Sequence, residues 1–202
     1  MTMFVVAATL LAPGCDTAPP PEPSLPRAAL TDAPARAPDR GKVRGGQKVM
    51  RAVRWPADSA RDPQVYGALD EQSRAAVDAS PVPVLLPNGP LSFERQQVMR
   101  GPQWYAFSGA RHGVTVSVQA SGQARVYPGV KPVPGSHTLR DQEAFVSSNE
   151  GIWAASWIEH GVAYDVSLEC APVDDPPCND EHTLVALVEG LVYVGGDEGA
   201  RR

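Results

Sequence analysis

Residues 151–170, GIWAASWIEHGVAYDVSLEC, restrict the fold of this chain more than any other stretch. If the central His-Gly pair forms a two-residue turn, Trp157 lies opposite Tyr164, Ala155 opposite Val166 and Trp153 opposite Leu168, so these apolar side chains share one face. One more residue in the turn would pair Trp157 with Ala163 and divide the apolar residues between two faces. The sequence therefore predicts an antiparallel hairpin with one buried face.

Three further segments have the pattern of regular elements. Alternating valines from 114 to 119 predict a strand, which a turn at SGQ would connect to 124–127, with Val118 opposite Val126. Asp62 followed by proline predicts a helix that continues to Ser80. Leucines and valines at helical spacing after residue 180 predict a C-terminal helix.

These elements belong to one domain. They predict an α+β fold in which an N-terminal and a C-terminal helix pack on one face of an antiparallel sheet, because a sheet with one apolar face must be covered. We expect the globular domain to comprise residues 62–202, since nothing in this stretch divides it or repeats.

The first residues of the chain are typical of an export signal. Met3 to Ala12 form an apolar run of ten residues, about half the length that crosses a bilayer as a helix. Such a run fits the apolar centre of a signal peptide, for which we take residues 1–14.

The end of this run, Leu11-Ala12-Pro13-Gly14-Cys15, resembles the processing site of bacterial lipoproteins. The resemblance implies cleavage before Cys15, acylation of its thiol and new amine, and a lipoprotein held on the membrane and facing the periplasm or the cell exterior. An ordinary secretory signal is the alternative.

Lipid on Cys15 would leave two of the three cysteines to pair. Cys170 and Cys178 stand close in the sequence, and in an oxidising compartment we expect a disulfide between them. A metal site is the rival interpretation, but one neighbouring histidine, His182, is a weak addition to two cysteines.

Residues 15–61 have the composition of a tether. Between Asp16 and Arg40, prolines and alanines with almost no large apolar side chains predict a disordered, extended spacer. Its end from Arg36 to Arg54 is basic, whereas residues 62–202 carry nine basic and 18 acidic residues. This asymmetry indicates contact of the basic arm with anionic lipid or cell-wall polymer, and a plain solvated linker is the alternative. Nucleic acid is not an expected partner of an exported, acidic chain.

No catalytic motif is present in the sequence. His112 and His160 precede glycines and are expected in turns, and neither Ser108 nor Ser136 has a local context that positions a base. Catalysis would require His112 or His137 within about 3 Å of a serine hydroxyl or a carboxylate at the mouth of a pocket.

Acidic residues near Cys178 could hold calcium, but prolines stand where an ion-binding loop has its glycine turn. We therefore expect no metal, no cofactor and no enzymatic activity.

Trp104 and Tyr105 are the aromatic residues that packing explains least, and they are the predicted binding surface. The sequence thus predicts a non-enzymatic binding or structural module of the cell envelope. The alternative is a periplasmic carrier or sensor that holds an acyl chain or a signalling partner. A large apolar cavity behind residues 114–127 would favour the carrier, and a filled core would favour the binding module.

Overall fold

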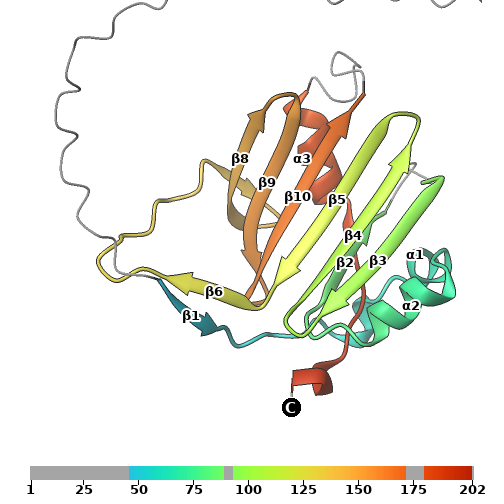
Figure 1. The fold of residues 1–202 in the computed structure, drawn as a ribbon, viewed down its shortest axis with the longest axis horizontal. Coiled ribbons are helices and arrows are strands. Elements are labelled where there is room, and N and C mark those ends of the chain that lie inside the picture. The colour runs from blue at the N-terminus through green and yellow to red at the C-terminus, as the bar shows by residue number, and fades with distance from the viewer. Residues whose placement is uncertain (1–45, 89–92, 172–179, 202) are drawn as a thin grey trace, which may run out of the picture. The chain divides into compact units, whose positions relative to one another are not determined.

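The computed structural model describes residues 46–88, 93–171 and 180–201. Within these residues the chain forms one sheet-rich domain, predominantly antiparallel β-sheet with few helices (Figure 1). No helix in this part of the chain is long and apolar enough to span a membrane.

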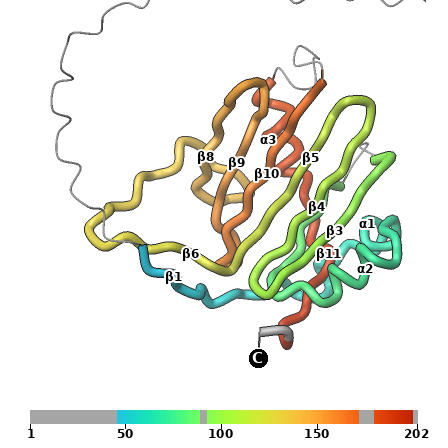
Figure 2. Tube along the Cα trace, viewed as in Figure 1, coloured from blue at the N-terminus to red at the C-terminus, as the bar shows by residue number. Residues whose placement is uncertain are grey.

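Seven antiparallel strands form the main sheet, in the order β3-β4-β5-β10-β9-β8-β7. Two meanders build it, β3 to β5 and β7 to β10, and they join where β5 pairs with β10 (Figure 2). The strands are β3 (Arg95–Gly101), β4 (Trp104–Arg111), β5 (Val114–Ser121), β7 (His137–Leu139), β8 (Gln142–Asn149), β9 (Ile152–Glu159) and β10 (Val162–Cys170).

The hairpin of β9 and β10 confirms the predicted register. Trp157 pairs with Tyr164, and their rings stack with centroids 5.4 Å apart. His160 and Gly161 both have positive φ, 55° and 78°, which is the backbone that a two-residue turn between twisted strands requires. Along β10, Val162, Tyr164, Val166, Leu168 and Cys170 are all buried, so one face of the strand is apolar throughout.

A second, two-stranded sheet of β2 (Val84–Pro87) and β11 (Leu191–Gly195) contributes to the same core. The hydroxyl of Tyr105 donates to the carbonyl of Leu85 and accepts from its amide. The hydroxyl of Tyr164 donates to the carbonyl of Pro83. Two buried tyrosines thereby satisfy polar groups of β2 and attach it to the main sheet.

The predicted N-terminal helix is two short helices, α1 (Pro63–Gly67) and α2 (Glu71–Asp78). Asp62 caps the first, as expected, and Asp70 caps the second by accepting from the amide of Ser73. An aspartate at this position prefers to bond the amides of a new helix start, which explains the break.

The predicted C-terminal helix is confirmed as α3 (Glu181–Glu189), capped by Asp180. In the described part of the chain, 3-10 turns are formed by Asp58–Ala60 and Glu198–Arg201. Leu184 and Val188 of α3 belong to the same buried cluster as Val77 of α2 and the apolar face of the main sheet.

One expectation about the chain's course is wrong. Val118 does not lie opposite Val126: it pairs with Phe107 and Val166 in the centre of the sheet. The strand β6 (Gln123–Val126) instead pairs with β1 (Gln47–Met50).

The folded part therefore begins well before residue 62. The compact unit comprises Lys42–Arg202, and the amide of Arg54 donates to the carbonyl of His160. The boundary between tether and domain at 61/62 falls inside this unit, and residues 46–61 belong to the fold.

Candidate functional site

The main sheet has one buried and one outer face. Successive side chains of a strand alternate between the faces, so cross-strand pairs define rows of outer residues. One row across β4, β5, β10 and β9 consists of Trp104, Ser121, Ala163 and Ile158. The next row consists of Ala106, Gln119, Asp165, Ser156 and Phe145, which extends it to β8. Small and polar side chains thus separate Trp104 at one end from Phe145 and Ile158 at the other.

Trp104 is held in place by its neighbour across the β3–β4 turn. The indole lies so close to Gly101 that a Cβ on that glycine would overlap it. The side chain therefore packs against Gly101, and 40% of the residue remains exposed. An indole fixed in this way presents a rigid apolar surface to solvent.

Tyr105, the other residue of the predicted pair, has no exposed surface. It follows Trp104 on β4 and therefore points to the opposite face, where it is fully buried. Burial raises the pKa of its hydroxyl, which is bonded to Leu85. Of the predicted pair, only Trp104 is exposed.

Two adjoining cavities line the outer face. The first, of about 430 Å³, lies between Trp104, Gln119 and Asp165. The second, of about 680 Å³, extends from Ile158 and Phe145 to Val133. Ser156, Ala163 and Tyr164 border both cavities, so the two form one groove across the strands, which we call the outer groove.

The outer groove contains hydrogen-bonding groups between its aromatic ends. The hydroxyl of Ser156 donates to Asp165 Oδ2 at 2.7 Å, which holds the carboxylate near the middle of the groove. Gln119 is the cross-strand neighbour of Asp165 on β5. An amide, a hydroxyl and a carboxylate beside an indole can bind a ligand that combines hydroxyl groups with an apolar ring face.

A serine, a histidine and a carboxylate meet at the edge strand β7. Ser136 Oγ lies 2.8 Å from His137 Nδ1, and His137 Nε2 lies 2.8 Å from Glu181 Oε1. This is the proximity that catalysis would require, but the serine is the exposed chain neighbour of the histidine. Four cavities are bordered by residues of the described ranges, and neither Ser136 nor His137 lines any of these four. The contact between Glu181 and His137 ties the start of α3 to β7.

His112 and His160 lie where the sequence predicts them. His112 and His160 have positive φ, 48° and 55°, and occupy the turns before Gly113 and Gly161. His112 lies 3.3 Å from Glu94, and both side chains are exposed.

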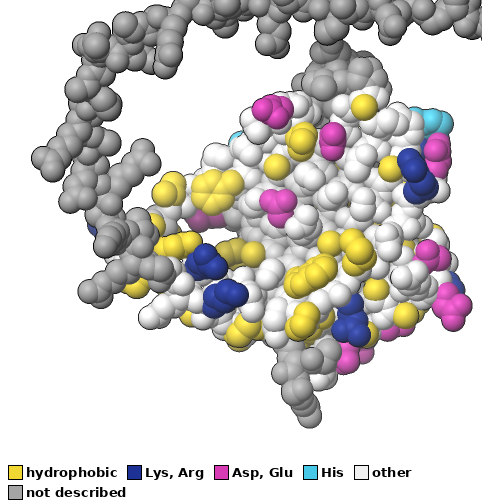
Figure 3. Space-filling view, in the orientation of Figure 1, with side chains coloured by type: hydrophobic (Ala, Val, Ile, Leu, Met, Phe, Trp, Pro, Cys, Tyr) yellow, Lys and Arg dark blue, Asp and Glu magenta, His cyan; other side chains and the backbone are white. Residues whose placement is uncertain are grey.

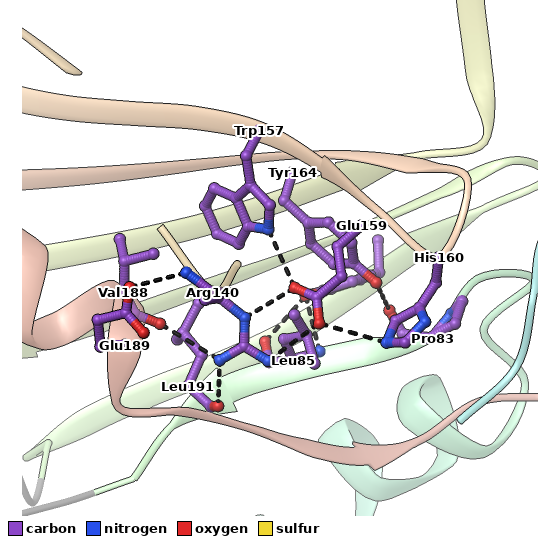
Figure 4. A network of polar contacts seen from close by, with 11 residues as sticks. Pro83, Leu85, Arg140, Trp157, Glu159, His160, Tyr164, Val188, Glu189 and Leu191 are labelled. Carbon is purple, nitrogen blue, oxygen red and sulfur yellow. Dashed lines mark hydrogen bonds and ion pairs between the residues drawn. The ribbon is translucent and has the colours of Figure 1, made fainter. Parts of the chain in front are cut away.

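A polar network lies at the turn end of the β9–β10 hairpin (Figure 4). Arg140 Nε lies 2.7 Å from Glu159 Oε2, and Arg140 Nη1 donates to the carbonyl of Leu191 at 2.7 Å. The indole of Trp157 donates to the same carboxylate. Burial alone would raise the pKa of Glu159, but the hydrogen bonds from Arg140 and Trp157 and the charge of Arg140 lower it below its ordinary value. The charged and polar groups of this network bond one another, which indicates a structural role.

Several predicted positions lie outside the described residues. Cys15, Cys178, Asp174 and Asp175 are among them. Cys170 is buried at the end of β10. Within the described residues, no three histidine, cysteine or acidic side chains gather as a metal site would need.

The sequence reasoning missed most of the outer groove. Phe145 stands between Ala144 and Val146, and Ile158 follows Trp157, so nothing local marks the face of Phe145 and Ile158 as the open one. The register of the β9–β10 hairpin was the usable signal. It places Ser156 and Asp165 on the face of the sheet opposite to that of the buried Trp157.

A search of family models, of curated proteins and of solved structures finds no match to this chain.

Proposed function

We propose that this chain is a cell-envelope lipoprotein whose folded unit binds cell-wall polymer at the outer groove and does not catalyse a reaction. In this proposal Cys15 is acylated and anchors the chain to the membrane, and the chain faces the periplasm or the cell exterior. Cys170 and Cys178 form a disulfide there. Both helical regions cover the same face of the main sheet, which leaves the opposite face open for a partner.

The observation that carries the proposal is the fixed indole of Trp104 at one end of the outer groove. Sugar rings present apolar faces that stack on indoles, and their hydroxyl groups bond carboxylates and amides such as those of Asp165 and Gln119. The groove crosses five strands, about 19 Å at the usual strand spacing, which suits a polymer better than a single small molecule.

A carrier of acyl chains is less well supported. Val116, Val118 and Ala120 point from β5 into a cluster that is buried throughout, together with Trp157 and Tyr164. A carrier needs an apolar space behind this strand, whereas close-packed side chains fit a module that binds at its surface.

The test is co-sedimentation of the protein with isolated cell-wall polymer. Because a central aromatic residue often dominates an interface, Trp104→Ala should weaken binding by about tenfold or more. Met99→Ala is the matched control, since Met99 is exposed on the same face but does not border either cavity of the groove.

Equal retention of the wild-type protein and Trp104→Ala would contradict the role of the groove. Equal losses in Trp104→Ala and Met99→Ala would show that the effect is not specific to the indole.

A further inference from the structure

A two-stranded extension beside the main sheet combines basic and exposed apolar residues. It consists of residues 46–57, with β1, and residues 122–136, with β6; we call it the basic ribbon. Its charge is of one sign: all 19 acidic residues from Gly46 onward lie elsewhere in the chain. The five basic residues of the ribbon are Lys48, Arg51, Arg54, Arg125 and Lys131.

The basic ribbon also exposes apolar side chains. Ten large apolar residues are exposed in the described part of the chain, and half of them belong to the ribbon. These five are Met50, Val126, Tyr127, Val130 and Val133, with exposed fractions between 38% and 72%. Exposed apolar residues gathered on one element mark a site of interaction, whereas scattered ones do not.

Local geometry explains why these side chains point to solvent. Lys48 and Arg125 are cross-strand partners and share their face with Met50. After β6, the amide of Val130 bonds the carbonyl of Tyr127 at 3.2 Å and closes a turn through Pro128 and Gly129. Gly129 has a φ of 83°, as the third position of a type II turn requires. The turn projects Tyr127 and Val130 away from the sheet.

Both kinds of side chain lie together on the surface. Figure 3 shows dark-blue basic side chains next to yellow apolar ones on the side of the molecule where β6 and β1 lie, while most magenta acidic side chains in this view lie elsewhere. A surface that is basic and apolar together is complementary to an interface that presents negative charge over hydrocarbon.

We propose that the basic ribbon docks on an anionic lipid bilayer. Its basic residues contact the headgroups, and Tyr127, Val130 and Val133 enter the boundary between headgroups and acyl chains. Each basic side chain near an anionic surface strengthens binding by about fivefold. The docking does not depend on the acylation of Cys15, so the two modes of membrane attachment can be tested separately.

The test uses the chain from residue 15 onward with Cys15→Ser, which keeps every described residue and carries no lipid. This protein should co-sediment with vesicles that contain phosphatidylglycerol at low salt, and salt should release it. Arg125→Gln/Lys131→Gln should weaken binding roughly 30-fold, because two charges are removed. Val130→Ser/Val133→Ser should weaken it without changing the salt dependence.

Two matched controls lie on the main sheet. Arg95→Gln removes an exposed basic residue of β3, and Met99→Ser an exposed apolar one, and both should bind as the wild type does. Failure of the wild type to bind these vesicles at low salt would overturn the proposal, as would unchanged binding of the ribbon variants. Salt-sensitive retention on isolated cell-wall polymer without vesicle binding would assign the ribbon to that polymer and also overturn it.

Discussion

Arg140 joins three parts of the fold through one residue. Its guanidinium binds Glu159 on β9 and the carbonyl of Leu191 at the start of β11, and its amide donates to Glu189 of α3. Arg140 and Glu159 retain only 16% and 13% of their side-chain exposure, so neither charge is well solvated without the other. A partly buried ion pair of this kind is costly to break on one side.

We expect Glu159→Gln to lower the free energy of unfolding at pH 7 by about 1–3 kcal/mol. The pKa of Glu159 is lower in the folded state than its ordinary value, so its contribution is present above the unfolded pKa and is lost as pH falls through the folded pKa. The gap between wild type and variant should therefore narrow on acidification below about pH 4.5. Urea unfolding at a series of pH values measures it.

Glu143→Gln is the control, since Glu143 is exposed on β8. A gap between wild type and Glu159→Gln that does not change with pH would contradict an ionised, paired Glu159.

At the scale of single residues, the sequence predicted burial best where the two-residue apolar period and the strand register agreed. The two-residue period also places Trp104 and Tyr105 on opposite faces of the sheet, because consecutive residues of a strand point to opposite sides. Which of the two faces would be buried depends on β2, whose backbone bonds Tyr105 from 20 positions away. Nothing near Trp104 in the sequence carries that information.

At the scale of elements, the turns with positive φ decide how the strands pair. Gly161 and Gly129 have nearly the same φ, 78° and 83°. A Cβ at Gly161 would overlap the carbonyl oxygen of Ala52, whereas nothing lies within 4 Å of a Cβ at Gly129. The two positions therefore separate the conformational cost of a side chain from its steric cost.

Gly129→Ala should cost about 1 kcal/mol of unfolding free energy, because alanine resists a positive φ. Gly161→Ala should cost about 2–4 kcal/mol of unfolding free energy, because the segment after β1 that contains Ala52 must also move. Urea unfolding of both variants gives the comparison. Equal losses would mean that residues 51–54 do not pack on the β9–β10 turn.

Elements with strictly local determinants were the ones predicted from the sequence. The β9–β10 hairpin and α3 follow from turn, cap and period within one segment. The pairing of β6 with β1 does not follow from one segment. The strand β1 precedes β6 by more than 70 residues and lies in a segment whose basic and proline-rich surroundings are typical of a linker. Because its basic composition indicated a linker, the strand β1 was not predicted.

At the scale of the whole chain, attachment to the membrane is the property to test first. Cys15→Ser should transfer the protein from the membrane to the soluble fraction in a high-salt wash, because each methylene of an acyl chain contributes about 0.8 kcal/mol to membrane binding. The high salt removes any contribution of the basic ribbon. Immunoblotting of both fractions measures the transfer. A serine variant that stays with the membrane under these conditions would rule out the lipid anchor.

The two meanders of the main sheet have a consequence for how this chain folds. Each meander contains only neighbouring strands, so its pairs form by closing short loops, whereas Val118 and Val166 of the joining strands are about 48 residues apart. Long loops cost more entropy to close, and contacts between distant residues slow folding. We therefore expect the β5–β10 pairing to limit the refolding rate, with each half of the sheet partly assembled beforehand.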